Sequence, residues 1–192
     1  MNLESKILNG IEKLSEVMKS LLWEKAKIHG ISPIQIQILL FVNNHRLDIC
    51  NVSYLAKEFN VTKATISDAV RVLLKKQLLA KDFSPIDNRR YNLLITDEGQ
   101  QIINDLSAYT LPITNSLINF SQKELVVFFE SISKLIFQLN QEGIIQVQRT
   151  CFNCKYYQGD KKSQHFCSLL KERLKSQDIR LDCGEFEDKA SA

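Results

Sequence analysis

Four of the five cysteines in this chain follow residue 150, in the pattern C-x2-C-x12-C-x15-C. They are Cys151, Cys154, Cys167 and Cys183. Four thiolates supply a tetrahedral ligand set, and each thiolate needs a cation to offset its charge. We therefore expect a metal or iron–sulfur centre in this segment.

The sequence leaves zinc and a [4Fe–4S] cluster as near-equal occupants of this centre. A structural zinc would explain how a short, loop-rich segment folds, although its second half lacks another C-x-x-C pair. The order Cys-x-Asn-Cys-x-Tyr-Tyr, Phe-Cys and Cys-Gly-Glu-Phe-Glu resembles small modules that hold a [4Fe–4S] cluster in accessory subunits of some glycyl-radical enzymes. Its aromatic residues would shield such a cluster from water. A metal-free dithiol switch ranks well behind both.

Two other residues could take part in thiol or metal chemistry. His165 lies two residues before Cys167, but four cysteines suffice as ligands, so we expect His165 to be a supporting residue at best. Cys50 stands alone in the sequence, with no cationic cluster near it beyond Arg46. We interpret Cys50 as a small buried residue in preference to a peroxide-sensing thiol.

A second set of polar residues lies on one face of a predicted helix after Thr62. Apolar residues at 66, 69, 70, 73 and 74 form the other face at helical spacing. Short polar groups near the start of such a helix can reach base edges in a major groove, and longer cations can reach phosphates. The residues that we assign to this contact are Lys63, Thr65, Ser67, Asp68 and Arg71. On this helix alone, a solvated amphipathic surface is equally favoured.

A basic loop follows this helix, between predicted strands at 78–83 and 91–95. The loop is rich in turn residues and ends in Arg89 and Arg90. Guanidinium groups presented in this way can enter a DNA minor groove. We expect Asp87 to hold one of them by a bidentate ion pair, which would fix its direction.

Two short helices must position this surface. Val52, Leu55, Ala56 and Phe59 recur at helical spacing, which predicts a first helix of about two turns. Asn60-Val61 interrupts the pattern, and Thr62 can cap the second helix through its hydroxyl. The two helices and the hairpin together predict a winged helix-turn-helix.

These residues resemble the MarR (multiple antibiotic resistance regulator) family of winged-helix transcription factors. The resemblance covers roughly residues 4–143, and its most specific parts are the Asp87-x-Arg89-Arg90 motif and the segment from Leu94 to Gly99 that leads into a long helix. It implies a homodimer on double-stranded DNA, with recognition helices in successive major grooves of a near-palindromic operator. It also implies a pocket for a small aromatic or phenolic effector.

The predicted fold class is mainly α with a small β-hairpin wing, long dimerisation helices and a small cysteine-rich C-terminal module. Further helices are expected from residue 3 to near Gly30, from Pro33, from 97 with a kink at Pro112, and after a capping box at 121–124. We divide the sequence into supporting helices (1–50), winged helix-turn-helix (51–96), dimerisation helices (97–146) and cysteine-rich extension (147–192).

The net charge of the chain is +3, and its distribution is more informative than its size. Residues 51–90 carry eight basic and four acidic residues, a net +4, whereas the rest carries 17 basic and 18 acidic residues, a net −1. The positive charge is therefore concentrated in the segment that would contact DNA. The apolar runs are too short for a membrane span, and we expect a cytoplasmic protein.

We expect a regulator and not an enzyme, because the three histidines are scattered and no Gly-rich phosphate loop occurs. One alternative is a redox or electron-transfer accessory subunit that uses the C-terminal cluster, with the winged helix as a protein-binding module. A flat salt dependence of DNA binding would favour a protein-binding role, since phosphate contacts impose a steep one.

Overall fold

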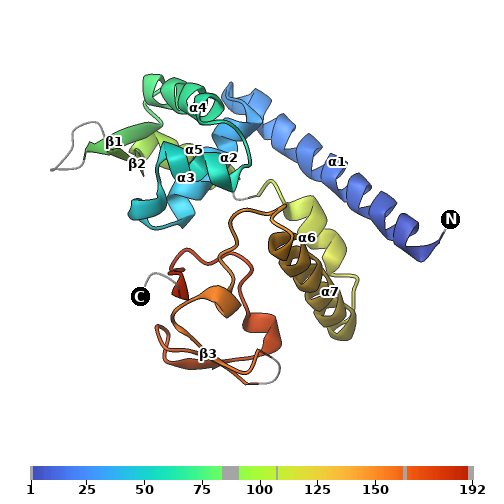
Figure 1. Cartoon of the computed structure of the whole chain (residues 1–192). Helices are drawn as coiled ribbons and strands as arrows, with labels where there is room; N and C mark the ends of the chain where they lie inside the picture. The colour runs from blue at the N-terminus through green and yellow to red at the C-terminus, as the bar shows by residue number, and fades with distance from the viewer. Residues whose placement is uncertain (1, 84–90, 107, 162–163, 190–192) are drawn as a thin grey trace. The chain divides into compact units, whose positions relative to one another are not determined.

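The computed structural model describes residues 2–83, 91–106, 108–161 and 164–189. These residues fall into two compact units (Figure 1). Unit 1 comprises Met1–Asn43 and Ala64–Asn119, and unit 2 comprises Asn44–Lys63 and Phe120–Ala192. The cysteine-rich segment therefore shares a unit with residues 44–63, which lie far from it in the sequence.

Unit 1 is mostly helical and contains one antiparallel hairpin. Its elements are α1 (Leu3–His29), α2 (Pro33–Asn44), α4 (Lys63–Lys75), β1 (Leu79–Phe83), β2 (Tyr91–Ile95), α5 (Asp97–Leu106) and α6 (Leu111–Leu117). The predicted end of the first helix is confirmed, because Gly30 follows it in a left-handed conformation with φ of 62°. Pro33 opens α2 as expected.

The core of unit 1 is apolar and comes from several elements. Ile36 and Leu39 of α2, Leu73 of α4, Leu93 of β2 and Leu106 of α5 have no exposed surface. Burial of each such side chain contributes about 1.5–3 kcal/mol relative to leaving it in water. Helix α2 has six buried residues and is therefore a central helix of unit 1.

One helix prediction is wrong. The sequence predicted one long helix from residue 97 with a kink at Pro112, but α5 ends at Leu106 and a separate helix, α6, begins at Leu111. Pro112 lies in the first turn of α6. Proline is tolerated there because the first N–H groups of a helix have no partner within it, whereas inside a helix it would break the hydrogen-bond ladder.

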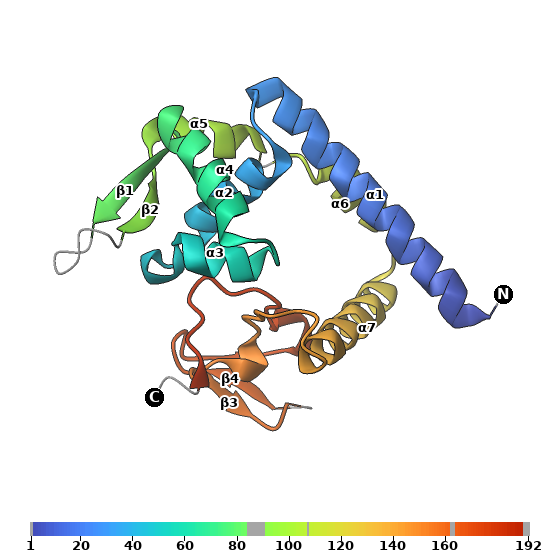
Figure 2. The same ribbon diagram turned by 45° about the horizontal axis from the view of Figure 1, so that its top comes forward.

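Unit 2 combines helical turns with a small sheet. Its elements are η1 (Leu47–Ile49), α3 (Val52–Glu58), α7 (Gln122–Gln141), η2 (Cys151–Asn153), β3 (Tyr157–Gly159), β4 (His165–Cys167), β5 (Glu172–Leu174) and η3 (Ser176–Asp178). The strands form an antiparallel sheet in the order β3-β4-β5. Figure 2 shows the last part of the described chain, in red, beside α3.

The capping box that opens α7 is confirmed. The Ser121 hydroxyl accepts a hydrogen bond from the Glu124 N–H at 3.4 Å, and the Glu124 carboxylate accepts one from the Ser121 N–H at 2.8 Å. No side chain of α7 is buried, although the helix carries a stripe of large apolar residues. Within the part of the chain that the structure describes, no helix has both the length and the apolar character that a bilayer span requires.

Candidate nucleic-acid interface and cysteine site

Helix α4 presents the polar face that the sequence predicted. Ile66 and Leu73 on its other face are fully buried. The assigned DNA-contacting residues lie on the outer face: Lys63, Thr65, Asp68 and Arg71 are exposed and Ser67 is partly exposed. A helix with this division can insert its polar face into a groove while its apolar face remains in the core.

An ion pair on this face orients one of the cations. Arg71 Nη2 lies 2.8 Å from Asp68 Oδ1, one helical turn away, and both side chains are exposed. An exposed pair of this kind contributes little to stability. Its consequence is geometric, because the Arg71 guanidinium has further N–H donors that remain available for a phosphate or a base edge.

The turn before α4 is tight. Helix α3 ends at Glu58, and Asn60 after it lies in the left-handed region, at φ of 51°. There the Val61 N–H donates to the Ala56 carbonyl at 3.0 Å. Asparagine tolerates this conformation better than most residues with a Cβ. Helix α4 then begins at Lys63, so four residues separate the two helices. This connection has the length expected of a helix-turn-helix.

The hairpin follows α4 directly. Strands β1 and β2 pair from Leu79 opposite Ile95 to Phe83 opposite Tyr91, as the sequence predicted. The Lys81 ammonium lies 4.2 Å from the centre of the Tyr91 ring, a cation–π contact near the open end of the hairpin. The predicted minor-groove contacts, Asp87, Arg89 and Arg90, lie outside the described residues.

The segment Thr96-Asp97-Glu98-Gly99 lies at the base of the hairpin and joins it to α5. The Thr96 hydroxyl donates to the Gln77 carbonyl at 2.6 Å and accepts the Gly99 N–H at 3.0 Å. A Cβ at residue 99 would lie 2.2 Å from the Leu78 carbonyl oxygen, closer than atoms can approach. Glycine is therefore required where the first turn of α5 packs against Leu78, the residue before β1.

The four C-terminal cysteines come from three parts of unit 2. Cys151 opens η2 and Cys154 follows it, Cys167 ends β4 opposite Tyr157 of β3, and Cys183 lies after η3. Arg180 links the first cysteine to the last, since its backbone N–H donates to Cys151 Sγ at 3.3 Å and its Nη1 donates to Cys183 Sγ at 3.7 Å.

The thiols of this group also influence one another electrostatically. Burial raises the pKa of the Cys151 thiol, and the charges of Cys183, Cys167 and Cys154 raise it further. Yet no three His, Cys, Asp or Glu side chains in the described ranges are placed to hold a metal ion as they stand.

His165 has a structural partner. The residue is 6% exposed, and its Nδ1 lies 2.7 Å from the Tyr157 hydroxyl oxygen, which also accepts the Lys161 N–H at 3.2 Å. Tyr157 belongs to the small core of the module, with Cys154 and Ile179. Through its Nδ1 contact with Tyr157, His165 therefore supports the packing around the cysteines.

Cys50 is buried, as we interpreted it. It is 1% exposed, and its thiol donates to the Arg46 carbonyl at 3.2 Å. Burial, with a smaller contribution from the charge of Asp48, raises the pKa of the thiol to about 11. A thiol with this pKa is protonated near neutral pH and is a poor nucleophile.

A buried arginine joins the cysteine module to α3. The Arg149 side chain is 3% exposed; its Nη1 and Nη2 donate to the Glu58 carboxylate at 2.5 and 2.8 Å, and its Nε donates to Asp182 Oδ1 at 2.6 Å. Nη1 also lies 3.3 Å from the Tyr54 hydroxyl. Burial opposes the charged guanidinium, but the hydrogen bonds to Glu58 and Asp182 outweigh it and raise the pKa of Arg149.

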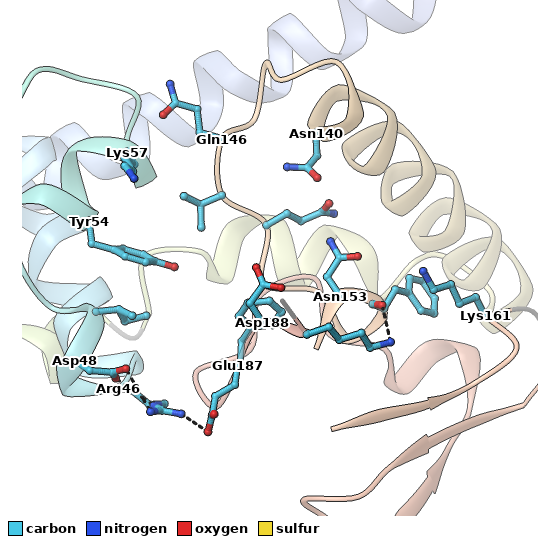
Figure 3. A pocket seen from close by; sticks show the side chains of 16 residues that line it. Arg46, Asp48, Tyr54, Lys57, Asn140, Gln146, Asn153, Lys161, Glu187 and Asp188 are labelled. Atoms are coloured by element: carbon cyan, nitrogen blue, oxygen red, sulfur yellow. Dashed lines mark hydrogen bonds and ion pairs between the residues drawn. The ribbon is translucent and has the colours of Figure 1, made fainter. Parts of the chain in front are cut away.

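Further contacts join the module to the segment around η1. His45 Nε2 lies 3.1 Å from Asp182 Oδ1, and Arg46 Nη1 lies 2.5 Å from Glu187 Oε1 (Figure 3). Gly184 contacts the same segment, because a Cβ at that position would lie 2.3 Å from the Asn44 carbonyl oxygen. The sequence analysis missed these contacts, since nothing in the order of residues pairs Arg149 with a residue 91 positions earlier.

A polar pocket of about 720 Å³ lies beside these contacts (Figure 3). Tyr54 and Lys57 of α3 line one part of it, and Asn153, Glu187 and Asp188 of the cysteine module line another. The pocket is therefore bordered by both the first helix of the helix-turn-helix and the segment that carries the cysteines.

Comparison with known proteins finds similarity over the winged-helix part. Residues 29–90 match the model of the MarR family. The structure resembles a MarR protein from Peptoclostridium difficile, with 25% identity, a TM-score of 0.58, and coverage of 73% of this chain and 92% of that one. No curated protein matches the chain in sequence.

Two Staphylococcus aureus structures share the fold. One is MepR in complex with DNA, with 21% identity, a TM-score of 0.60, and coverage of 72% of this chain and 99% of that one. The other is MarR with salicylate and kanamycin, with 17% identity, a TM-score of 0.63, and coverage of 73% and 94%. These similarities confirm the predicted fold, mainly α with a small β-hairpin wing, and residues 29–90 match the MarR family model.

Proposed function

We propose that this chain regulates transcription by binding double-stranded DNA, with α4 in the major groove and the hairpin wing at the flanking minor groove. The observation that carries the proposal is the face of α4 described above, where exposed Lys63, Thr65 and Arg71 lie opposite a fully buried apolar stripe. The fold is that of MarR-type DNA-binding regulators, and S. aureus MepR, which shares it, is solved in complex with DNA.

The proposed assembly is a homodimer. Helix α1 is 27 residues long and exposes a row of large apolar side chains, among them Leu3, Ile7 and Leu14, each more than half exposed. Helix α7 also leaves Phe128 and Leu135 exposed, each by about 40%. A second copy is the partner that we propose for these faces, because a two-fold dimer also places two recognition helices in successive major grooves of a near-palindromic operator.

Selection of duplexes from a randomised library by the purified chain tests the DNA-binding proposal. We expect a near-palindromic consensus. Replacing Arg71 by Ala should then weaken binding by about 1–3 kcal/mol and reduce the slope of log affinity against log salt concentration by about one. The control is Arg173→Ala, on exposed strand β5, which should leave the affinity and the slope unchanged. We expect Arg89→Ala to weaken binding by a similar 1–3 kcal/mol. Equal affinities of the Arg71 and Arg173 variants would refute the role of α4.

A metal centre bound by Cys151, Cys154, Cys167 and Cys183 is the second part of the proposal. A single zinc needs all four sulfurs about 2.3 Å from one point, whereas a [4Fe–4S] cluster spreads its cysteines over a larger body. The four cysteines lie in one unit and the pKa of the Cys151 thiol responds to the other three, which supports a shared centre and leaves zinc and a cluster as alternatives. The N–H groups of Arg180 that contact two of the sulfurs would tune such a cluster.

Purification without oxygen tests this choice. A brown protein with about four irons and matching sulfide per chain would support the cluster. A colourless protein with about one zinc per chain would support a structural ion in its place. A chain that binds neither would refute the centre.

A small-molecule effector completes the proposal. S. aureus MarR, which shares the fold, is solved with salicylate and kanamycin. Salicylate is therefore the first probe, and we expect it to raise the melting temperature of the chain and to weaken its hold on the selected duplex. Unchanged melting at saturating salicylate would remove this compound from consideration.

A further inference from the structure

We propose that unit 2 binds an aromatic carboxylic acid with one N–H or O–H donor, in a second pocket between α7 and the cysteine module. This pocket has a volume of about 370 Å³, within the range of small-molecule sites. Its lining residues all belong to unit 2. They also lie outside residues 29–90, the part that the family model covers. The inference goes beyond the proposed function, since it needs neither DNA nor a bound metal.

The walls of the pocket are mainly apolar and aromatic. Helix α7 contributes Phe129 and Phe137, and Phe137 is 39% exposed. The module contributes Phe152 and Ile179. Ile179 is buried in the small core, and the Phe152 ring packs on that core, with its centre 5.4 Å from the centre of the Tyr157 ring. Aromatic rings from both α7 and the module favour a flat apolar ligand.

Two lysines give the pocket a positive charge. Lys134 of α7 and Lys161, which follows β3, line it together with a single acid, Glu130. Both lysines are exposed, and neither ammonium forms an ion pair with any residue in the described ranges. Two positive charges against one negative charge favour a ligand with one carboxylate, because opposite charges steer and orient a bound molecule.

A buried hydrogen-bond acceptor at this pocket has no partner. Gln148 is one of the lining residues, and its Oε1 is buried and accepts no hydrogen bond from the described part of the chain. Buried polar atoms in folded proteins are nearly always paired, and leaving one unpaired costs free energy. A ligand that donates to this oxygen should therefore bind more tightly than the same shape without a donor. This is the reason for the N–H or O–H group in the proposed ligand.

The buried His165 offers a donor to the ligand carboxylate. Its Nδ1 contacts the Tyr157 hydroxyl, whose oxygen already accepts the Lys161 N–H, so we assign the hydroxyl proton to the bond with Nδ1. A neutral ring then carries its own proton on Nε2, for which the described residues supply no hydrogen-bond partner. Since His165 lines the pocket, this N–H can serve a bound anion beside the two ammonium groups.

The pocket uses a different face of α7 from the one that we propose for dimerisation. At 3.6 residues per turn, Ser133 and Phe137 of the pocket lie roughly half a turn from Phe128 and Leu135 around this helix. A second copy on the Phe128 face would therefore leave the pocket open. This separation favours a small ligand over a second copy of the chain as its occupant.

Titration calorimetry of the full chain, with indole-3-acetate as the probe, tests the proposal. We expect one site per chain. Naphthalene-1-acetate has a similar shape but no N–H, and it should bind about fivefold more weakly. Tryptamine, a cation with the same indole ring, should not bind. Amide hydrogen exchange should slow in residues 129–137 and 148–152 when indole-3-acetate is bound.

Three variants locate the site. Lys134→Gln should weaken indole-3-acetate binding about fivefold, whereas Lys123→Gln, on the same helix but away from the pocket, should leave it unchanged. Gln148→Met should remove the preference for the indole over the naphthalene acid, because it removes the acceptor and keeps the length of the side chain. Thermal unfolding of each variant without ligand shows whether it is folded.

Each result decides the inference. It would be overturned by no binding of indole-3-acetate at millimolar concentration, by tryptamine that binds as tightly, or by equal affinities of the Lys123 and Lys134 variants. An undiminished preference for the indole acid in Gln148→Met would refute the role of the buried oxygen. A chain that binds the acid as expected but no DNA would retain this site and refute the proposed regulatory function.

Discussion

The winged-helix core of unit 1 and the cysteine module of unit 2 are stabilised in different ways. In unit 1, large aliphatic side chains from α2, α4, β2 and α5 are fully buried against one another. The core of the module consists of Cys154, Tyr157 and Ile179, with partly buried aromatics around it. Its strands have three residues each, and it depends on ion pairs to α3 and η1. Apolar burial therefore suffices for the first region, whereas the second needs polar contacts and, in our proposal, a bound metal.

The largest effect that separates the two regions should come from a cysteine. We expect Cys154→Ser to abolish metal binding and to remove hydrogen-exchange protection from the module, while unit 1 keeps its own. Cys50→Ser is the matched control, since Cys50 contacts the carbonyls of residues 45 and 46. Metal analysis together with exchange measurements checks the pair, and a full metal content in Cys154→Ser would contradict the four-cysteine site.

A neighbouring pair of leucines tests how far unit 1 depends on burial. Leu93 of β2 is fully buried, and Leu94 is 40% exposed. Replacing Leu93 by Ala should lower the free energy of unfolding by about 2–5 kcal/mol, because it leaves a cavity. Leu94→Ala should cost less than about 1 kcal/mol. Denaturant unfolding measures both, and similar losses would show that the core is not as described.

Replacing either of two glycines by alanine should change the stability less, and the two changes should have opposite signs. Gly99→Ala places a methyl group against the Leu78 carbonyl and should destabilise the chain by about 1–3 kcal/mol. Gly10 lies inside α1 with nothing within 4 Å of an added Cβ, so Gly10→Ala should stabilise by about 1 kcal/mol. Thermal unfolding compares them, and a neutral Gly99→Ala would contradict the close approach at the base of the wing.

The smallest effect concerns pH. The pKa of Asp182 is lowered to about 2, because its hydrogen bonds to His45 and Arg149 outweigh the effect of burial. A lowered carboxyl pKa stabilises the fold above its unfolded value near 3.9, and this contribution is lost as the pH falls from about 4 to about 2. Since 53% of the side chain is exposed, we expect about 1 kcal/mol at most after screening. Asp182→Asn should remove this part of the acid dependence, and an unchanged acid transition would contradict the ion pair.

The periodic part of the fold was predictable because each of its elements is encoded locally. The capping box at Ser121, the helix end at Gly30 and the hairpin between 79 and 95 all depend on residues a few positions apart. The break between α5 and α6 was missed, because Pro112 is compatible with either a kink or a new first turn.

The contacts of the cysteine module were not predictable in the same way. Arg149 meets Glu58 across 91 residues and Asp182 across 33, and no periodicity relates the three. The sequence alone indicates an ordinary turn at Gly184, whereas the structure shows that this residue contacts the Asn44 carbonyl. Local patterns specify which helix forms, but long-range ion pairs depend on how the module packs against α3.

The most direct test of the central claim is the affinity of the purified chain for the selected duplex as a function of salt. If α4 and the wing bind DNA, the logarithm of the affinity should fall steeply and linearly with the logarithm of salt concentration, with a slope near −0.9 per phosphate contact. Arg71→Ala should lower that slope by about one. A flat dependence would contradict DNA binding and would favour a protein-binding role for the winged helix.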